Sequence, residues 1–244
     1  MDFFGMPIAR YSNGMIKLTI SNSVEIEKQI NGDKKYGNDE AKIEFDKYSK
    51  SKAMIERHLT SIIWTIKMSN SIRGVKKQHA RLLGKYIKGM GFDSFLDQLS
   101  SGQKSRNLVV NMIKYLASNS DAGRQLSWCS KICKYLDCWY YGKSIPNYQN
   151  HFAVYDHVVA TVLPYYLKKY RVMNKKKWWW PNDLTTSKVW QNYDSFNDLV
   201  GELLHQVAIK DGQSLTKHQL DHLLWYQYKN YDRARLKKAI ESYL

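Results

Sequence analysis

Apolar residues recur every three or four positions along most of the chain, the spacing that places them on one face of an α-helix. The clearest stripe consists of Met54, Ile55, Leu59, Ile62, Ile63 and Ile66. Alternating runs of Val, Ile and Thr, which are typical of half-buried strands, are scarce. The 244 residues include only 4 prolines and 13 glycines, so few positions interrupt a helix. The pattern therefore predicts an all-α, multi-helix fold with about nine helices.

Glycines and capping residues indicate where these helices begin and end. The stripe stops near residues 71–74, Gly89 and Gly91 end the next helix, and Asp93 is expected to cap the short helix that follows. Further helices are expected at about 104–118, 124–136, 155–170, 195–210 and 215–244, the last with a break near Asn230.

We expect a single domain over residues 1–244, because the chain is long enough for one large core and contains no internal repeat. Residues 1–40 are predicted to be the least regular part. The stretches 137–146 and 171–194 are predicted to be irregular and rich in aromatic side chains.

Positive charge is the strongest global signal. Lys and Arg number 38 against 22 Asp and Glu, which gives a net charge of +16 and a pI near 9.6. Such a field attracts polyanions, so nucleic acid is the expected partner, and a charge that only keeps the protein soluble is the alternative. The chain has no apolar run of about 18 residues, and its first residues do not resemble a secretory signal. We therefore expect a cytoplasmic protein that does not enter membranes.

The sequence contains no motif that is typical of metal or cofactor binding. Cys129, Cys133 and Cys138 lack the Cys-x-x-Cys pair of common zinc and iron–sulfur sites, and we expect reduced thiols. His218 and His222 are four positions apart, but no Glu or Cys accompanies them in the sequence, so both are expected to be structural. We predict neither a metal nor a cofactor.

Two short stretches carry the residues that favour catalysis, SWCSKICKYL at 127–136 and FAVYDHVVATVL at 152–163. The first places Lys131 just inside a helix, where the helix dipole and apolar neighbours both disfavour the ammonium form. The second places Asp156 at a helix start, where a carboxylate can accept backbone N–H bonds. An amine can attack the anomeric carbon of a sugar while a carboxylate stabilises the charge that develops as the base leaves. A plain helix cap and a solvated lysine are the alternatives.

The same stretches resemble the bacterial 8-oxoguanine DNA glycosylase-like proteins of the helix-hairpin-helix glycosylase superfamily. The matching residues are Ser127, Ser130, Lys131, Ile132, Cys133 and Tyr135, then Phe152, Val154, Tyr155 and Asp156, and near the end Leu220, Asp221, Leu224 and Trp225. The resemblance implies an all-α glycosylase domain with its hairpin and active site in residues 119–170. It also implies that Lys131 forms a Schiff base with the sugar and that Asp156 assists departure of the base.

Three differences from the family pattern bear on DNA contacts and base specificity. The segment SNSDAGRQLSW before Lys131 lacks a clear Leu-Pro-Gly-Val-Gly hairpin, and Ala153 stands where a Pro is common. The aromatic loop DCWYYGKSIPNYQNH is longer than the family pattern leads us to expect, which leaves room for a bulkier base.

Further residues are candidates for contacts with DNA or with the flipped base: Arg124, Trp128, Lys134, Tyr155, Lys175, Lys176, Lys177, Trp178, Asp221 and Trp225. Lysines suit phosphates and flat indoles can stack on bases, and packing against the domain is the alternative for the tryptophans. The basic residues along 75–90 are interpreted as a solvated helix face.

We therefore predict a monomeric DNA glycosylase with AP-lyase activity that flips a base out of double-stranded DNA and cleaves its N-glycosidic bond. The base is oxidised guanine in a repair role, or a bulky modified base of a phage genome in a defence role. The alternatives are a nucleic-acid-binding module without catalysis and a basic protein with a different partner.

Overall fold

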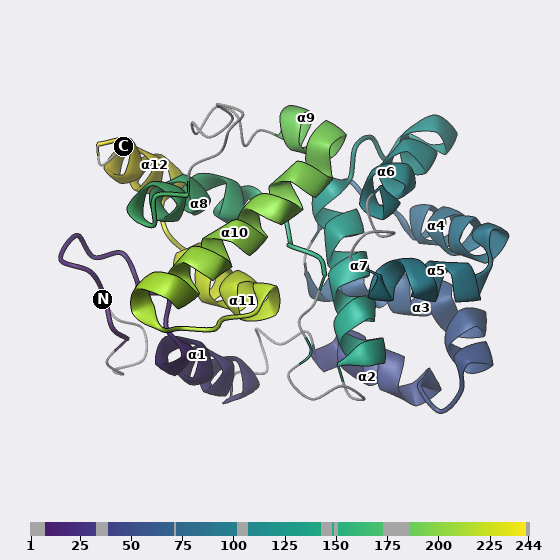
Figure 1. The fold of residues 1–244 in the computed structure, drawn as a ribbon. Coiled ribbons are helices and arrows are strands. Elements are labelled where there is room, and N and C mark those ends of the chain that lie inside the picture. Colours follow the sequence, from purple (N-terminus) through teal and green to yellow (C-terminus); the bar gives the residue numbers. More distant parts are fainter. Residues whose placement is uncertain are drawn as a thin grey trace.

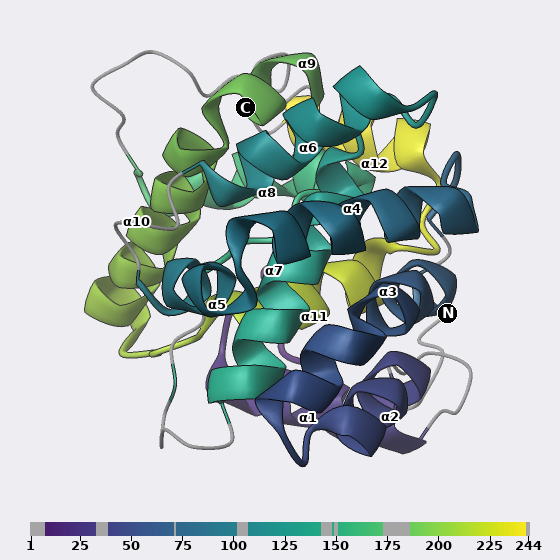
Figure 2. The same ribbon diagram turned by 90° about the vertical axis from the view of Figure 1, so that its right-hand side faces the viewer.

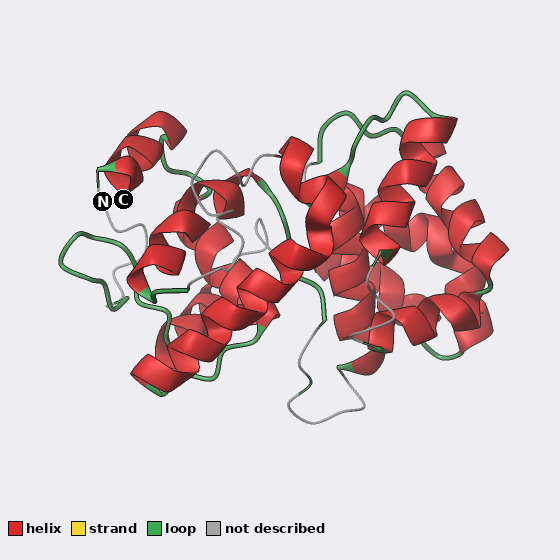
Figure 3. Cartoon of the chain, turned by 45° about the horizontal axis from the view of Figure 1, so that its top comes forward, coloured by secondary structure: helices red, strands yellow, loops and turns green. Residues whose placement is uncertain are grey.

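The computed structural model describes residues 8–32, 39–70, 72–101, 107–142, 148, 151–172 and 186–242. No β-strand occurs among these residues, and a single isolated bridge pairs Arg10 with Ile16. Helices make up the rest of the regular structure (Figure 3). The prediction of an all-α, multi-helix fold is confirmed. None of the described helices is long and apolar enough to cross a bilayer.

The helices have clear boundaries along the chain. In order they are α1 (Ile20–Gly32), α2 (Asp39–Tyr48), α3 (Lys52–Ser69), α4 (Lys77–Met90), α5 (Phe92–Ser100), α6 (Leu108–Asn119), α7 (Leu126–Tyr141), α8 (His157–Lys169), α9 (Thr186–Val189), the 3-10 helix η1 (Trp190–Asn192), α10 (Tyr193–Asp211), α11 (Lys217–Tyr228) and α12 (Arg233–Glu241).

The helices form two groups (Figure 1). Helices α2 to α7 pack on one another in the first group, and α1, α8, α10, α11 and α12 form the second. The short helix η1 contacts both α6 and α10 and so joins the groups. Buried apolar side chains of both groups belong to one continuous cluster, which is the arrangement expected of a single domain.

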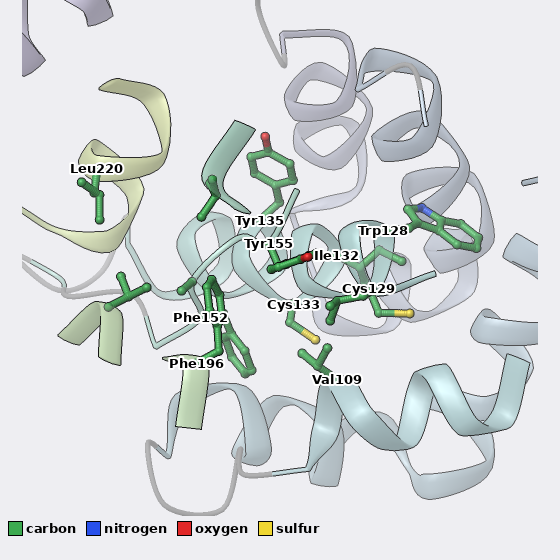
Figure 4. Packing of buried hydrophobic residues seen from close by; sticks show 14 of the residues in the cluster. Val109, Trp128, Cys129, Ile132, Cys133, Tyr135, Phe152, Tyr155, Phe196 and Leu220 are labelled. Carbon is green, nitrogen blue, oxygen red and sulfur yellow. The ribbon is translucent and has the colours of Figure 1, made fainter. Parts of the chain in front are cut away.

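Helix α7 lies at the centre of this arrangement. In the turned view, α3, α4, α5 and α6 lie in front of it, and the second group lies behind (Figure 2). It is buried over 12 of its 16 residues, as expected for a helix with apolar side chains around most of its circumference. Cys129, Ile132 and Cys133 project from it into a core shared with Val109 of α6 and Phe196 of α10 (Figure 4).

The first group contains a close approach between two helices. A Cβ atom at Gly84 of α4 would lie 2.6 Å from the Thr60 hydroxyl oxygen of α3. Glycine at this position therefore lets the two helices meet at short range. The helix ends as predicted at Gly91, whose φ of 87° lies in the left-handed region.

Several predicted boundaries are wrong for local reasons. Helix α1 occupies part of the segment expected to be irregular, because Ile26 and Ile30 are buried on one face of it. Helix α7 continues to Tyr141 instead of ending near residue 136, and Trp139 stacks one turn after Tyr135 with ring centres 5.1 Å apart. The cap of α5 is Gly91, not Asp93, which lies in the first turn.

Other corrections concern the second half of the chain. Helices α9 and η1 and the start of α10 fall within 171–194, so the expected irregular stretch is shorter. The described residues form the α-helices α1 to α12, whereas about nine helices were predicted. The predicted break in the last helix is confirmed between α11 and α12, and Thr216 caps α11 through Gln219.

Trp128→Ala should lower the free energy of unfolding by about 3–5 kcal/mol, because the indole is fully buried in α7 and its loss leaves a cavity. Urea denaturation followed by far-ultraviolet circular dichroism measures this change. Met68→Ala in α3 removes a side chain that is 50% exposed and should stay within about 0.5 kcal/mol of the parent. A parent-like midpoint for Trp128→Ala would contradict the central position of α7.

Candidate active site

Lys131 and Asp156, which come from different helix groups, lie side by side. Lys131 is in the second turn of α7, and Asp156 is the residue that precedes α8. The Lys131 Nζ atom lies 3.5 Å from Asp156 Oδ2, and the two side chains are each 6% exposed. The structure therefore places the two residues that were predicted to be catalytic in one buried ion pair.

Capping of α8 fixes the orientation of the Asp156 carboxylate. Its Oδ1 accepts hydrogen bonds from the backbone N–H groups of Val158 and Val159, each at 3.0 Å. These donors are free at a helix start, and the helix dipole also favours a negative charge there. Because Oδ1 is engaged, Oδ2 is the oxygen that faces Lys131.

Ser130 joins the two predicted catalytic stretches directly. Its hydroxyl donates to the Ser127 carbonyl and accepts from the Tyr155 backbone N–H, both at 3.2 Å. Ser130 is fully buried, so these bonds satisfy a polar group that would otherwise be costly in the core. Tyr155 precedes Asp156, and Ser130 precedes Lys131. The bond between them therefore holds the two predicted catalytic residues at a fixed position relative to each other.

A second buried ion pair lies close to the first. Lys134 Nζ is 2.7 Å from Asp221 Oδ2 of α11, and the Lys134 side chain has no exposed surface. Burial alone would lower the pKa of Lys134, but the Asp221 carboxylate outweighs it and raises this pKa above its ordinary value. Lys134, which was predicted to contact DNA, is thus paired with Asp221 inside the protein in this structure.

The two ion pairs act on each other electrostatically. Burial alone would raise the pKa of Asp221, but Lys134, then His222 and Lys131, together hold it below its ordinary value. Within the described part of the chain, Asp221 Oδ1 has no hydrogen-bond partner. Two lysines of α7 thus face two carboxylates of the opposite group, with one carboxylate oxygen uncommitted.

A small hollow lies beside this cluster. It is lined by Ala153, Val154, Val159, Leu163, Val200, Lys217, Leu220, Asp221 and Leu224, which come from α8, α10, α11 and the segment before α8. Its walls are mostly apolar, with one lysine and one carboxylate among them. The hollow has room for about one water molecule, so it is a packing gap and not a small-molecule site.

Lys217 is a candidate that the sequence reading missed. Its Nζ donates to the His151 carbonyl oxygen and to Asn197 Oδ1, each at 2.9 Å. Burial lowers its pKa to about 8. An amine with this pKa is partly unprotonated near neutral pH, and such lysines occur at nucleophilic sites. The segment before α11 gives no motif that would have indicated this.

Asp137 anchors the chain between α7 and Asp156. Its fully buried carboxylate accepts the Tyr148 hydroxyl and, at 2.8 Å, the His151 backbone N–H. Burial, then the hydrogen bond to Asp137, raises the pKa of Tyr148. These bonds hold the connection to α8, and they explain why a carboxylate can occupy the core at this position.

The histidine pair on α11 has an acidic neighbour after all. Glu27 of α1 lies with its Oε1 2.6 Å from His222 Nδ1 and 4.0 Å from His218 Nε2. The statement that no Glu accompanies the pair holds along the sequence but is wrong in space.

The remaining predicted contacts fall into different surroundings. Trp128, which was predicted to contact DNA or the base, is fully buried in the core, where it packs against the domain. Tyr155 packs edge-on against Phe196, with ring centres 5.5 Å apart. Trp225 is half-buried, and Lys229 Nζ lies 4.0 Å from the centre of its ring. The predictions for Lys175, Lys176, Lys177 and Trp178 lie outside the described residues.

Exposed basic residues flank the turn between α6 and α7. Arg124 in the turn is exposed, as are Lys77, Arg81, Lys85 and Lys88 on the outer face of α4. Asp121 of the turn is held by His79 Nε2 at 2.8 Å and Lys76 Nζ at 2.7 Å. The turn is thereby attached to the start of the basic helix. The interpretation of the α4 residues as a solvated face agrees with their exposure.

No protein-family model, curated protein or solved structure matches this chain.

Asp221→Asn should lower the free energy of unfolding at pH 7 by about 3 kcal/mol or more, because Lys134 would stay buried without a counter-charge. The folded-state pKa of Asp221 is depressed, so its stabilisation is present above the ordinary value of 3.8 and is lost as the pH falls through the folded pKa. Urea titrations should therefore show a larger difference in unfolding free energy between the parent and Asp221→Asn at pH 7 than at pH 3. Glu202→Gln, at an exposed position of α10, is the control.

Lys217 should titrate near pH 8, because burial disfavours its ammonium form. Nuclear magnetic resonance of the protein with ¹³C-labelled lysine side chains measures this midpoint, and Lys217→Met assigns the signal. Exposed Lys114 of α6 serves as the comparison within the same spectrum. A Lys217 midpoint above about 10, as for an ordinary lysine, would contradict a desolvated site.

Proposed function

We propose that this protein is a DNA glycosylase with lyase activity, in which Lys131 is the nucleophile and Asp156 its partner. The observation that carries the proposal is the buried Lys131–Asp156 pair at the junction of the two helix groups, with Nζ and Oδ2 3.5 Å apart. A lysine beside a carboxylate fixed at a helix start suits attack on a sugar carbon that becomes positive.

The reaction follows from the two groups. Asp156 Oδ2 accepts a proton from Lys131, and the neutral amine attacks C1′ of the sugar. The N-glycosidic bond breaks, its electron pair leaves with the base, and the base takes up the proton that Asp156 accepted. The C1′ adduct then opens the sugar ring to a Schiff base, from which elimination of the 3′ phosphate cleaves the strand. Once it has returned this proton, the Asp156 carboxylate opposes the positive charge at the sugar.

The charge of the protein supports a DNA substrate. The net charge of +16 and the exposed lysines of α4 favour binding of a phosphate backbone. Oxidised guanine and a bulky modified base are the two substrate classes that we propose to test. Tyr140 and Tyr141 belong to helix α7. The aromatic loop is therefore shorter than the sequence indicates, and it leaves less room for a bulky base.

A nucleic-acid-binding module without catalysis is the second candidate. The ion pair itself favours it, since a lysine committed to a buried carboxylate can serve stability alone. In that case DNA affinity falls steeply with salt, and no covalent adduct forms on any substrate.

Borohydride trapping tests the proposal. Incubation with duplexes that carry 8-oxoguanine, bulky modified cytosine or an unmodified sequence, followed by reduction, should yield a covalent protein–DNA adduct on one modified duplex. Lys131→Gln should abolish the adduct. Asp156→Asn should reduce its rate by roughly 100-fold or more, since the amide can still accept the two N–H bonds of α8 but carries no charge.

Two further variants make the result specific. Lys114→Ala, at an exposed position of α6, should trap as the parent does. An adduct that survives Lys131→Gln but is lost in Lys217→Gln would assign the nucleophile to Lys217 instead. Base release without any adduct, and dependent on Asp156, would mean a monofunctional enzyme. Tight, salt-sensitive binding with neither adduct nor release would reject glycosylase activity in favour of the binding module.

A further inference from the structure

Three side chains from distant parts of the sequence converge at the contact between α1 and α11. Glu27 comes from α1, and His218 and His222 come from successive turns of α11, 195 positions after Glu27 in the case of His222. One nitrogen of each imidazole and one oxygen of the carboxylate all lie within 4.8 Å of one another. The imidazole rings are neighbours, with their centres 4.0 Å apart.

We propose that Glu27, His218 and His222 form a binding site for a divalent transition-metal ion, of which Zn²⁺ is the representative. Two imidazole nitrogens and one carboxylate oxygen are a ligand set that Zn²⁺ takes in proteins, with a fourth position left for water. Histidines at positions i and i+4 of a helix project from the same face, so α11 presents both of them toward Glu27.

The present contacts favour a metal over a simple ion pair. His218 Nε2 and His222 Nδ1 both face the same carboxylate oxygen of Glu27. An ion pair or hydrogen bond between Glu27 and one imidazole would use only one of these two nitrogens. A single Zn²⁺ ion could instead accept a nitrogen from both imidazoles and an oxygen from the carboxylate.

An ion can also reach the site. The side chains of Glu27 and His218 are 32% and 34% exposed, and that of His222 is 13% exposed. The site is therefore half-open to solvent, while the carboxylate and imidazoles are close enough to need only small side-chain rotations. Zn²⁺–ligand bonds are about 2.0–2.2 Å long, so these rotations must bring each ligand atom to that distance from the ion.

A bound ion would clamp α1 to α11 and thereby steady the helix that carries Asp221. Asp221 directly precedes His222, and it pairs with Lys134 of α7. The metal would act on the position of that pair without being a reactant. This inference is independent of glycosylase activity.

Metal binding to the full-length, tag-free and metal-stripped chain tests the site without DNA. Isothermal titration with Zn²⁺ should give one site per chain. Saturating Zn²⁺ should raise the melting temperature by roughly 5 °C or more, because the ion binds the folded state only. Co²⁺ should give visible absorption bands of a nitrogen and oxygen site, without the strong thiolate band that binding to Cys138 would produce.

Matched variants separate the site from adventitious binding. Glu27→Gln keeps the shape of the side chain, and it and His222→Ala should each weaken Zn²⁺ binding at least 10-fold. His205→Ala removes an exposed histidine of α10 and should bind as the parent does. If His222→Ala does not fold, Glu27→Gln alone decides. Parent-like affinity in Glu27→Gln, a thiolate spectrum, or no saturable Zn²⁺ binding would overturn the proposal.

Discussion

Two lysines of one central helix are buried against carboxylates from the opposite helix group, and the architecture depends on this constraint. Removing a charged ammonium group from water costs several kcal/mol, and only a partner at close range offsets that cost. Lys134 and Asp221 meet at 2.7 Å, and Lys131 and Asp156 at 3.5 Å. Asp156 caps α8 and Asp221 lies in α11. Helix α7 can therefore be buried only where both of these helices pack beside it.

The two ion pairs differ in distance and burial, and this difference suits one to a structural role and the other to the proposed reaction. Lys134 has no exposed surface and sits at hydrogen-bond distance from its partner, which suits a structural contact. Lys131 lies farther from Asp156, whose other oxygen is already bound to the start of α8. A longer, weaker contact leaves the amine easier to release from its partner. For this reason the same kind of pair can hold the fold in one place and support a reaction one turn away.

Local patterns in the sequence predict the helices well but not their depth in the fold. The apolar stripe of α3, the glycine after α4 and the start of α11 near residue 215 all depend on neighbouring residues, and those predictions are confirmed. Asp156 as a cap is likewise a local property. The fate of Lys134 depends on Asp221, 87 positions later, and no pattern around Lys134 distinguishes it from a surface lysine. Glu27 could not be connected with His222 for the same reason.

The order in which a ribosome delivers these partners has a consequence for the newly made protein. Both lysines of α7 leave the ribosome well before α11, so Lys134 has no counter-charge while the first helix group is forming. Until α11 has been synthesised, burial of α7 would leave Lys134 without a counter-charge, whereas Asp156, the partner of Lys131, is already present. The proposed catalytic centre would thus be held in its final position only after α11 has been synthesised.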